Sequence, residues 1–280
     1  IFWVANCPDI LVIPLVLRRK RYILEYRSPW SFEVETEFGL KPIFYLAAII
    51  ERMALEHAAL ITLTTSRLME KVKSFHKPVF VIPNYPLKTF GTVTISTQEL
   101  RESNDCGEED RVVLFVGKLS RVEGADLFPK IIENAMSQAE DNIVFWIVGD
   151  GPFYPALREF AKAIPRNVKL LGWQPHNRIP NFISAADVCI VPRHKSAFQV
   201  FYNEENVFKI SEYMFFEKPI VACGIAESQE YLLVDEDEMG EAILKALNGA
   251  VRIPNRRIWE DHSEKKIHEM LSSIQLCNRR

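Results

Sequence analysis

Three groups of residues in the second half of the chain have the types and spacing needed to bind a phosphorylated ligand. In the first group, Gly117 and Lys118 end an apolar run, and Arg121 and Gly124 follow. A glycine at a strand end lets a ligand approach the backbone, and flexible cations near a helix N-terminus neutralise phosphate charge. This pattern suits a diphosphate clamp, but surface cations after a strand are also common.

The second group is the turn Gly149-Asp150-Gly151, followed by Pro152. Its glycines permit a tight turn, and proline is favoured in the first turn of a helix. The spacing differs from G-x-G-x-x-G, which disfavours a dinucleotide-dependent oxidoreductase. A structural strand-to-helix turn and a ligand contact both remain open for this group.

The third group places Glu204 and Glu212 eight residues apart, with Lys209 between them. If a helix begins near Asn206, Glu204 lies just before it and Glu212 about two turns inside it. Two carboxylates at these positions would accept hydrogen bonds from the hydroxyls of a sugar and a ribose, while the helix N-terminus favours a phosphate. From the spacing alone, an amphipathic helix with solvated charges is the favoured interpretation.

The elements that must position these residues are alternating strands and helices. In the first half, strands are predicted over 1–6, 21–26, 60–65 and 79–83, and helices over 8–17, 42–58 and 66–75, the last capped by Ser66. In the second half, strands are predicted over 111–117, 142–148, 167–173, 187–193 and 219–223, and helices over 125–138, 153–163, 178–185, 206–216, 226–232 and 236–248. This alternation predicts parallel sheets, whose ligands bind beyond the carboxyl ends of the strands where the strand order reverses.

The length and the polarity of the chain predict its domains. At ~150 residues per domain, 280 residues correspond to about two domains. We expect an N-terminal domain over 1–92, a linker over 93–110 with a short strand at 92–96, and a second domain over 111–254. The segment 255–280 reads as a C-terminal helix that crosses back to the first domain, anchored by Trp259 and Ile267, or as a plain surface helix.

The composition excludes several classes of protein. Hydrophobic residues make up 48% and charged residues 25%, which is ordinary for a globular chain and excludes a disordered or collagen-like one. The net charge of −3 argues against nucleic acid as a partner. No serine nucleophile motif of the form G-x-S-x-G is present.

Cysteines and histidines give no sign of a metal site. The five cysteines form no C-x-x-C pair, and the six histidines show no metal-binding spacing, so no metal is predicted. Because the cysteines are scattered and their total is odd, they favour reduced thiols and a cytoplasmic protein, with Cys189 and Cys223 as small core residues. His176 and His194 fall in loops at the expected ligand edge, where a single histidine is more often a bystander than a participant.

A basic run follows the apolar segment Ile10–Leu17, which is too short to span a bilayer. It consists of Arg18, Arg19, Lys20 and Arg21. The favoured interpretation is a buried helix whose final cations suit its dipole. The alternative is a peripheral contact with an anionic membrane surface, at the inner face of the membrane.

Taken together, residues 111–223 resemble the donor domain of the retaining GT-B glycosyltransferases of the GT4 group, the glycosyl transferases group 1. The matching stretches are VLFVGKLSRVEG, FWIVGDGP, VKLLGWQPHNRIPNFISAADVCIVP and NVFKISEYMFFEKPIVA. The phrases A-A-D-V-x-x-x-P and E-Y-M-x-x-x-K-P-I-V-A are the most specific. The resemblance implies an α/β fold of GT-B type with two Rossmann-like doubly wound domains. The first is expected to be incomplete, because the family's glycine-rich loop is absent and Ile1 enters inside that domain.

The resemblance also implies roles for individual residues. Glu212 would bind the ribose of a nucleotide, and Glu204 would contact the donor sugar and position it for transfer. Lys118 would hold a phosphate, with Arg121 stabilising the leaving diphosphate. The other implied donor-binding residues are Lys209, Phe208, Gly117, Gly149 and Gly151, with Trp173, Gln174 and Pro175 near the base.

One residue departs from the family pattern. Glu123 stands where the family usually has its second phosphate-binding cation. Arg121 or Lys209 must compensate for it, and Lys209 fits a subgroup of the form N/P-x-x-K-x-x-E-Y-M. In that subgroup the first glutamate is less regular, so Glu205 is an alternative to Glu204.

The function implied by the resemblance is transfer of a sugar from a nucleotide-sugar donor to an acceptor hydroxyl with retention, as in hexosyltransferases. Cations and helix dipoles would replace a metal, so no cofactor is expected. The acceptor would be a glycan, a lipid-linked molecule or a protein. The alternatives are a non-catalytic nucleotide-sugar binding module and another GT-B enzyme such as a sugar epimerase.

Overall fold

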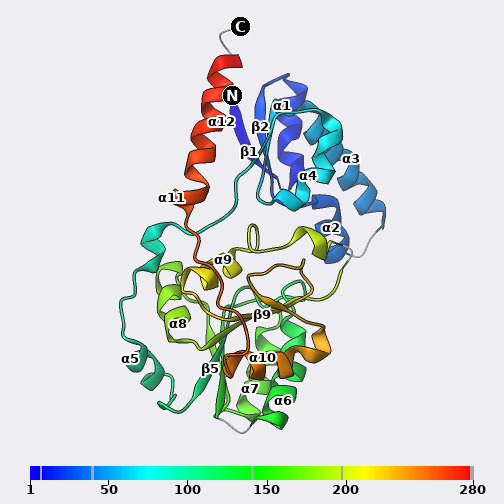
Figure 1. The fold of residues 1–280 in the computed structure, drawn as a ribbon. Helices are drawn as coiled ribbons and strands as arrows, with labels where there is room; N and C mark the ends of the chain where they lie inside the picture. The colour runs from blue at the N-terminus through cyan, green and yellow to red at the C-terminus, as the bar shows by residue number, and fades with distance from the viewer. Residues whose placement is uncertain (7, 39–40, 140–141, 197, 278–280) are drawn as a thin grey trace. The chain divides into compact units, whose positions relative to one another are not determined.

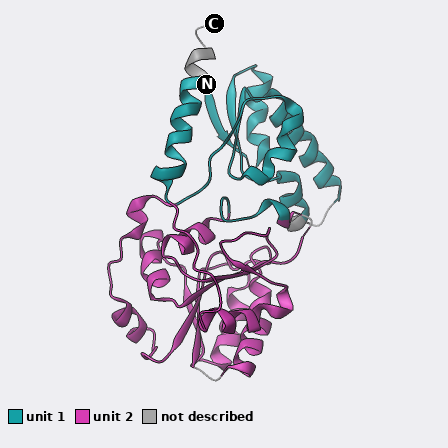
Figure 2. Cartoon of the chain, in the orientation of Figure 1, with its two compact units in different colours: residues 1–85, 200–206, 258–280 teal, residues 86–199, 207–257 magenta. Residues whose placement is uncertain are grey.

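The computed structural model describes residues 1–6, 8–38, 41–139, 142–196 and 198–277 (Figure 1). Its contacts divide the chain into two compact units, coloured separately in Figure 2. Unit 1 comprises residues 1–85, 200–206 and 258–280, and unit 2 comprises residues 86–199 and 207–257. Each unit is built on its own parallel sheet, which confirms the predicted α/β class.

The sheet of unit 1 has the order β1-β2-β3-β4. Its strands are β1 (Phe2–Ala5), β2 (Tyr22–Tyr26), β3 (Leu60–Leu63) and β4 (Val79–Val81). Successive strand residues face opposite sides. Leu24 and Ile61 therefore join one apolar cluster, and Ile23 and Leu60 join another.

Helices supply both clusters of unit 1. The helices are α1 (Ile13–Leu17), α2 (Trp30–Phe38), α3 (Lys41–His57), α4 (Met69–Val72), α11 (Trp259–His262) and α12 (Glu264–Cys277). Segments α1, α3 and α4 contribute to the cluster of Leu24, while α12 contributes Met270 to that of Ile23. Trp259 and Ile267 pack against this second cluster. The C-terminal helix is therefore part of unit 1 and not a plain surface helix.

Unit 2 contains a six-stranded sheet in the order β10-β9-β8-β5-β6-β7. Its strands are β5 (Arg111–Val116), β6 (Ile143–Val148), β7 (Val168–Gly172), β8 (Val188–Pro192), β9 (Ile220–Cys223) and β10 (Leu232–Leu233). The chain adds β6 and β7 on one side of β5, then returns to add β8 on the other. The strand order thus reverses between β5 and β8, where ligands of open α/β sheets bind.

The helices of unit 2 cover this sheet. They are α5 (Thr97–Glu102), α6 (Phe128–Gln138), α7 (Tyr154–Ala163), α8 (Ile179–Ala185), α9 (Phe208–Phe215) and α10 (Met239–Leu247). All six residues of β6 are buried, as the apolar run predicts. Cys189 and Cys223 are fully buried in strands, which confirms them as core residues, whereas Cys7 lies outside the described residues.

Several predicted elements were wrong. No strand forms over 92–96; instead Ser96 accepts a hydrogen bond from the Glu99 N–H and begins α5. The helix expected over 226–232 is absent, because the Glu230 carboxylate is held by Asn255 and Arg257 in a turn before β10. The helix α2 was not predicted.

Two predicted helix starts were also shifted. Thr65, not Ser66, caps the helical turn that precedes α4, because its hydroxyl accepts the Arg67 N–H. The helix expected near Asn206 begins at Phe208. The Asn206 side chain instead closes a turn with residues before it, donating to the Phe201 carbonyl and accepting the Asn203 N–H.

Candidate functional site

The loops after β5 and β6 are in direct backbone contact in unit 2. The Gly117 N–H donates to the Val148 carbonyl at 3.0 Å, and the Leu119 N–H donates to the Asp150 carbonyl at 2.9 Å. A Cβ at Gly149 would lie 1.8 Å from the Gly117 carbonyl oxygen, closer than any real contact. The glycine turn at 149–151 is therefore required for packing, which supports its structural interpretation and places its backbone beside the loop of Lys118.

Lys209, in the first turn of α9, reaches the same loop. A Cβ at Gly117 would lie 2.5 Å from the Lys209 Nζ, so a side chain there would displace the ammonium from its present position. The Nζ also lies 4.2 Å from the centre of the Phe115 ring, in cation–π geometry. The structure thus brings together Gly117 and Lys209, two residues of the predicted donor set.

The carboxylate of Glu123 binds Lys209 and a second cation. The Lys209 Nζ lies 2.6 Å from one Glu123 oxygen, and the Arg193 guanidinium lies 3.2 Å from the other. Burial alone would raise the pKa of Glu123, but the charges of Lys209 and Arg193 outweigh it and lower the pKa to about 2. Glu123 is therefore ionised, and two cations against one carboxylate leave net positive charge where β5 meets β8.

This network resolves the departure seen in the sequence. Lys209 does neutralise Glu123, and it does so together with Arg193, which the sequence analysis missed. Arg193 directly follows β8, so its place at a strand end was the available signal. Lys118 and Arg121 are exposed in the loop after β5, and neither forms an ion pair with a residue that the structure describes.

Glu212 is buried on α9 with a histidine at its carboxylate. His176 Nε2 lies 2.6 Å from Glu212 Oε1. The hydrogen bond with Glu212 raises the pKa of His176, whereas burial raises the pKa of Glu212. The rings of Phe90 and Phe208 lie near the imidazole, with centroids 5.2 Å and 6.0 Å away. His176, expected as a bystander, is thus a direct partner of Glu212, the residue predicted to bind the ribose.

The three predicted base-binding residues follow β7. Trp173 is 70% exposed, which leaves its ring available to a ligand. The Gln174 side chain donates to the Leu171 carbonyl at 3.0 Å, and Pro175 precedes the helical turn that carries His176. Gln174 therefore helps to shape this loop.

Glu204 and Glu205 belong to the segment 200–206, whose contacts group it with unit 1. The Glu205 carboxylate accepts hydrogen bonds from the Thr65 hydroxyl at 2.8 Å and the Ser66 N–H at 2.9 Å. These bonds give Glu205 a structural role at a helix start. Glu204 is buried in the same segment, and its contact with a donor sugar stays a prediction.

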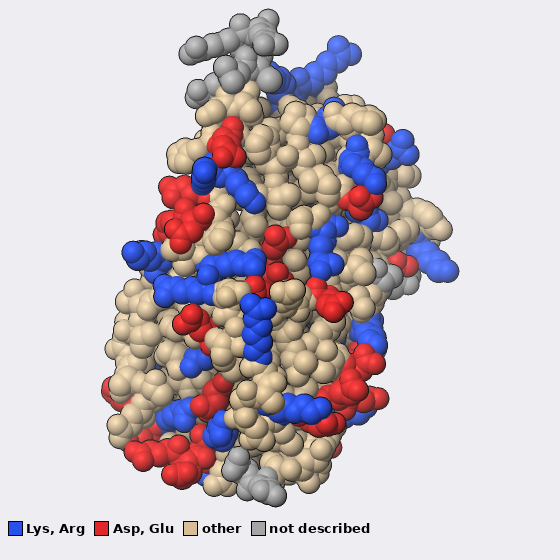
Figure 3. All heavy atoms as spheres, in the orientation of Figure 1, with Lys and Arg blue, Asp and Glu red and all other residues tan. Residues whose placement is uncertain are grey.

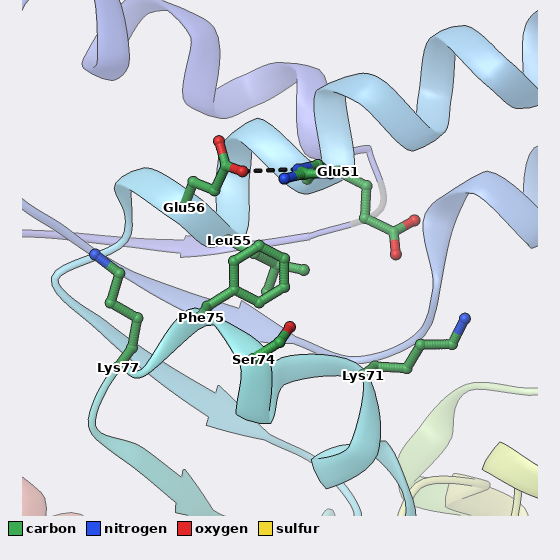
Figure 4. Close-up of a pocket in the computed structure, with 8 residues that line it drawn as sticks. Glu51, Leu55, Glu56, Lys71, Ser74, Phe75 and Lys77 are labelled. Carbon is green, nitrogen blue, oxygen red and sulfur yellow. Dashed lines mark hydrogen bonds and ion pairs between the residues drawn. The ribbon is translucent and has the colours of Figure 1, made fainter.

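Unit 1 holds two cavities. One, of about 300 Å³, lies where its four strands end and is lined by Asn6, Arg27, Ser28, Glu33, Thr64, Asn84, Tyr202 and Asn206. The other, of about 530 Å³, is a groove between α3 and the segment 71–77, which begins in α4 (Figure 4). Leu55 and Phe75 form its centre, with Lys71 and Lys77 to either side. None of the predicted donor residues lines either cavity.

Charges of both signs are mixed over one face of the molecule, and the described residues form no metal-binding cluster. Lys and Arg are interspersed with Asp and Glu over the face shown in Figure 3. Within the described ranges, no three His, Cys, Asp or Glu side chains are grouped so that they could hold a metal ion. No helix among these residues is long and apolar enough to cross a bilayer.

Comparison with solved structures shows the fold. HepE of Anabaena in complex with UDP shares 18% identity at a TM-score of 0.69, over 97% of this chain and 79% of that chain. HepE in complex with UDP-glucose shares 17% identity at a TM-score of 0.62, over 89% of this chain and 69% of that chain. Sucrose-phosphate synthase of Thermosynechococcus elongatus shares 17% identity at a TM-score of 0.65, over 95% of this chain and 71% of that chain. No curated protein matches the chain in sequence.

A family model described as "Glycosyl transferases group 1" matches residues 110–249, half of the chain. The matched region contains the loops after β5, β6 and β7 and the helix α9. Of the predicted site residues, Glu204 is the one that the contacts group with unit 1. The chain therefore belongs to the glycosyl transferases group 1, the GT4 glycosyltransferases of GT-B fold, which use nucleotide-sugar donors.

Proposed function

We propose that this chain transfers a sugar from a nucleotide-sugar to an acceptor hydroxyl and keeps the anomeric configuration of the donor. The observation that carries the proposal is the position of Lys209 beside Gly117, where β5 meets β8. A cation held against a glycine loop, at the start of a helix and at a strand-order reversal, suits a diphosphate. The family match supports the same reaction class.

In this mechanism the cations act on the leaving group. Lys118, Arg121 and Lys209, with the N-terminus of α9 at Phe208, stabilise the negative charge that grows on the diphosphate. The bond between the anomeric carbon and the diphosphate oxygen breaks. The acceptor oxygen forms its bond to the same face of that carbon, and the acceptor proton passes to the departing diphosphate.

The nucleoside would bind at the other end of α9. Glu212 would accept hydrogen bonds from the ribose hydroxyls, sharing or exchanging its contact with His176. The loop of Trp173, Gln174 and Pro175 would lie near the base. Because HepE was solved with UDP and UDP-glucose, uridine nucleotides are the first donors to test.

The acceptor side belongs to unit 1 in this proposal. The cavity of about 300 Å³ follows the carboxyl ends of all four strands and has polar walls. Asn6, Arg27 and Thr64 offer hydrogen-bonding groups there for a hydroxylated acceptor, whether glycan, lipid-linked or protein. Glu204, also in unit 1, would contact the donor sugar.

The proposal includes no metal, because cations of the chain supply the positive charge. It also includes a cytoplasmic location, supported by the free, buried thiols of Cys106, Cys189 and Cys223.

Calorimetric titration with UDP-, GDP- and ADP-glucose, in the presence of EDTA, tests donor binding. We expect one of the three nucleotides to bind with EDTA present. Binding of none would overturn the donor site, and binding only after Mg²⁺ is added would overturn the metal-free part. Retention is tested by following the slow hydrolysis of the bound donor by NMR. We expect α-glucose to appear first, and the appearance of β-glucose first would contradict retention.

A further inference from the structure

On the outer side of the helix layer in unit 1, several solvent-exposed side chains are apolar where polar ones would be expected. The segments Asp9–Val12 and α1 pack beside α3 on the cluster that contains Leu24. On the side away from this cluster, Leu17 is 78% exposed and Ile49 is 67% exposed. A helix at a protein surface normally turns polar residues outward.

Residue spacing gathers the exposed apolar side chains of α3 on one side of that helix. The most exposed apolar residues of these segments are Ile10, Leu11, Leu17, Tyr45, Leu46 and Ile49. Ile49 lies four residues after Tyr45 and three after Leu46, so all three side chains are on the same side of α3. Single exposed apolar residues are common, but a group of this kind marks an interaction surface.

Positive charge adjoins this apolar group. Arg18, Arg19, Lys20 and Arg21 directly follow α1, and all four are exposed. The sequence contains no acidic residue from Ile10 to Leu24. Because α1 has only five residues, the dipole interaction favoured from the sequence engages few of these cations.

We propose that this α1–α3 surface, formed by the six apolar residues above and Arg18–Arg21, docks on an anionic lipid bilayer. The apolar side chains would enter the boundary between headgroups and acyl chains, and the cations would bind lipid phosphates. The contact proposed here is with the surface of the bilayer.

Two other occupants fit less well. A second copy across a two-fold axis would bring the four cations of one chain toward those of the other, which costs binding energy. Nucleic acid would suit the cations but not exposed Leu17 and Ile49, and the net charge of the chain is −3. Charge and apolar surface together therefore favour the bilayer.

Vesicle co-sedimentation tests the proposal. The vesicles contain phosphatidylcholine with 30% phosphatidylglycerol, or phosphatidylcholine alone, at 0.1 M and 0.5 M NaCl. We expect binding to the anionic vesicles that weakens at high salt. The partition constant should fall roughly tenfold for every one to two cations removed, so the variant R18S/R19S/K20S/R21S should lower it more than ~100-fold.

The apolar half of the surface is tested separately. L17S/I49S should lower binding at least ~10-fold, because both side chains are lost from the boundary region. The matched controls are K265S/K266S, two exposed cations of α12, and I253S, an exposed apolar residue of unit 2; each should bind as wild type.

Four results would overturn the proposal. The first is that the wild type does not sediment with anionic vesicles, and the second is that both surface variants bind the vesicles as the wild type does. The third is a surface variant in which only the oligomeric state changes, and the fourth is a surface variant that loses only binding to DNA. Nucleotide titration of the same variants keeps the proposal separate from the catalytic one, since none of the substituted residues lies in the donor site.

Discussion

Replacing Glu123 with glutamine removes the carboxylate that Lys209 and Arg193 both bind in unit 2. In the wild type the two distances are 2.6 Å and 3.2 Å, and all three side chains are at least three-quarters buried. Glutamine keeps the shape of the side chain but leaves two cations facing each other without their counter-charge. Loss of one partner of a buried ion pair typically costs about 3–5 kcal/mol.

The pKa of Glu123 gives an independent magnitude. It falls from 4.5 to about 2 in the folded chain. At 1.36 kcal/mol per unit, this corresponds to about 3 kcal/mol of stability at pH 7. Because the folded pKa is the lower one, this stability is complete above pH 4.5 and is lost as the pH falls toward 2. Roughly half of it should remain at pH 3.

Urea unfolding of wild type and E123Q, at several pH values from 7 to 3, measures this difference directly. We expect a difference of about 3 kcal/mol at pH 7 that narrows to roughly half at pH 3. The matched control is E241Q, which breaks an exposed pair with Lys245 on α10 and should cost less than ~0.5 kcal/mol. Equal stability of wild type and E123Q at pH 7, or a difference that does not change with pH, would refute the reasoning.

Three further variants test other parts of the site. K118A/R121A should weaken donor binding at least ~10-fold in calorimetry while leaving the melting temperature unchanged, because both side chains are exposed; unchanged affinity would remove them from the site. If the donor binds Glu212, protonated His176 should compete with the donor for that carboxylate, because its hydrogen bond to Glu212 raises the pKa of His176. Donor affinity should therefore rise with pH between 6 and 9, and H176A should give a flat profile; parallel profiles would contradict the competition. G149A places a Cβ 1.8 Å from a carbonyl oxygen of the β5 loop and should destabilise the fold by at least ~2 kcal/mol in thermal unfolding, whereas G107A, with its nearest contact at 3.6 Å, should be close to neutral; equal effects would show that the loops do not need this glycine.

Strands could be predicted from the sequence because each is a local apolar run. The stretch Ile143–Val148 is buried throughout, and its boundaries were expected to within one residue. Elements fixed by distant contacts could not be predicted. The segment 226–232 has helical character, yet Glu230 is held by Asn255 and Arg257, more than twenty residues away.

The same distinction applies to the donor site. Gly117 and Lys118, at a strand end, could be proposed from the sequence because the strand-end rule depends only on the order of elements. The partners of Glu123 lie 70 and 86 residues further along the chain, and His176 precedes Glu212 by 36 residues. Such pairings depend on the packing of α9 against the loops, which no local spacing encodes.

The central claim is that unit 2 binds a nucleotide-sugar through Glu212. Its most direct test is calorimetric titration of the donor that binds best into wild type, E212A and the exposed control E241A, each first shown to be folded by circular dichroism. A charged hydrogen bond to a ribose hydroxyl is worth about 1.5–3 kcal/mol, so E212A should bind at least ~10-fold more weakly while E241A binds as wild type. A folded E212A that binds the donor with wild-type affinity would contradict the claim.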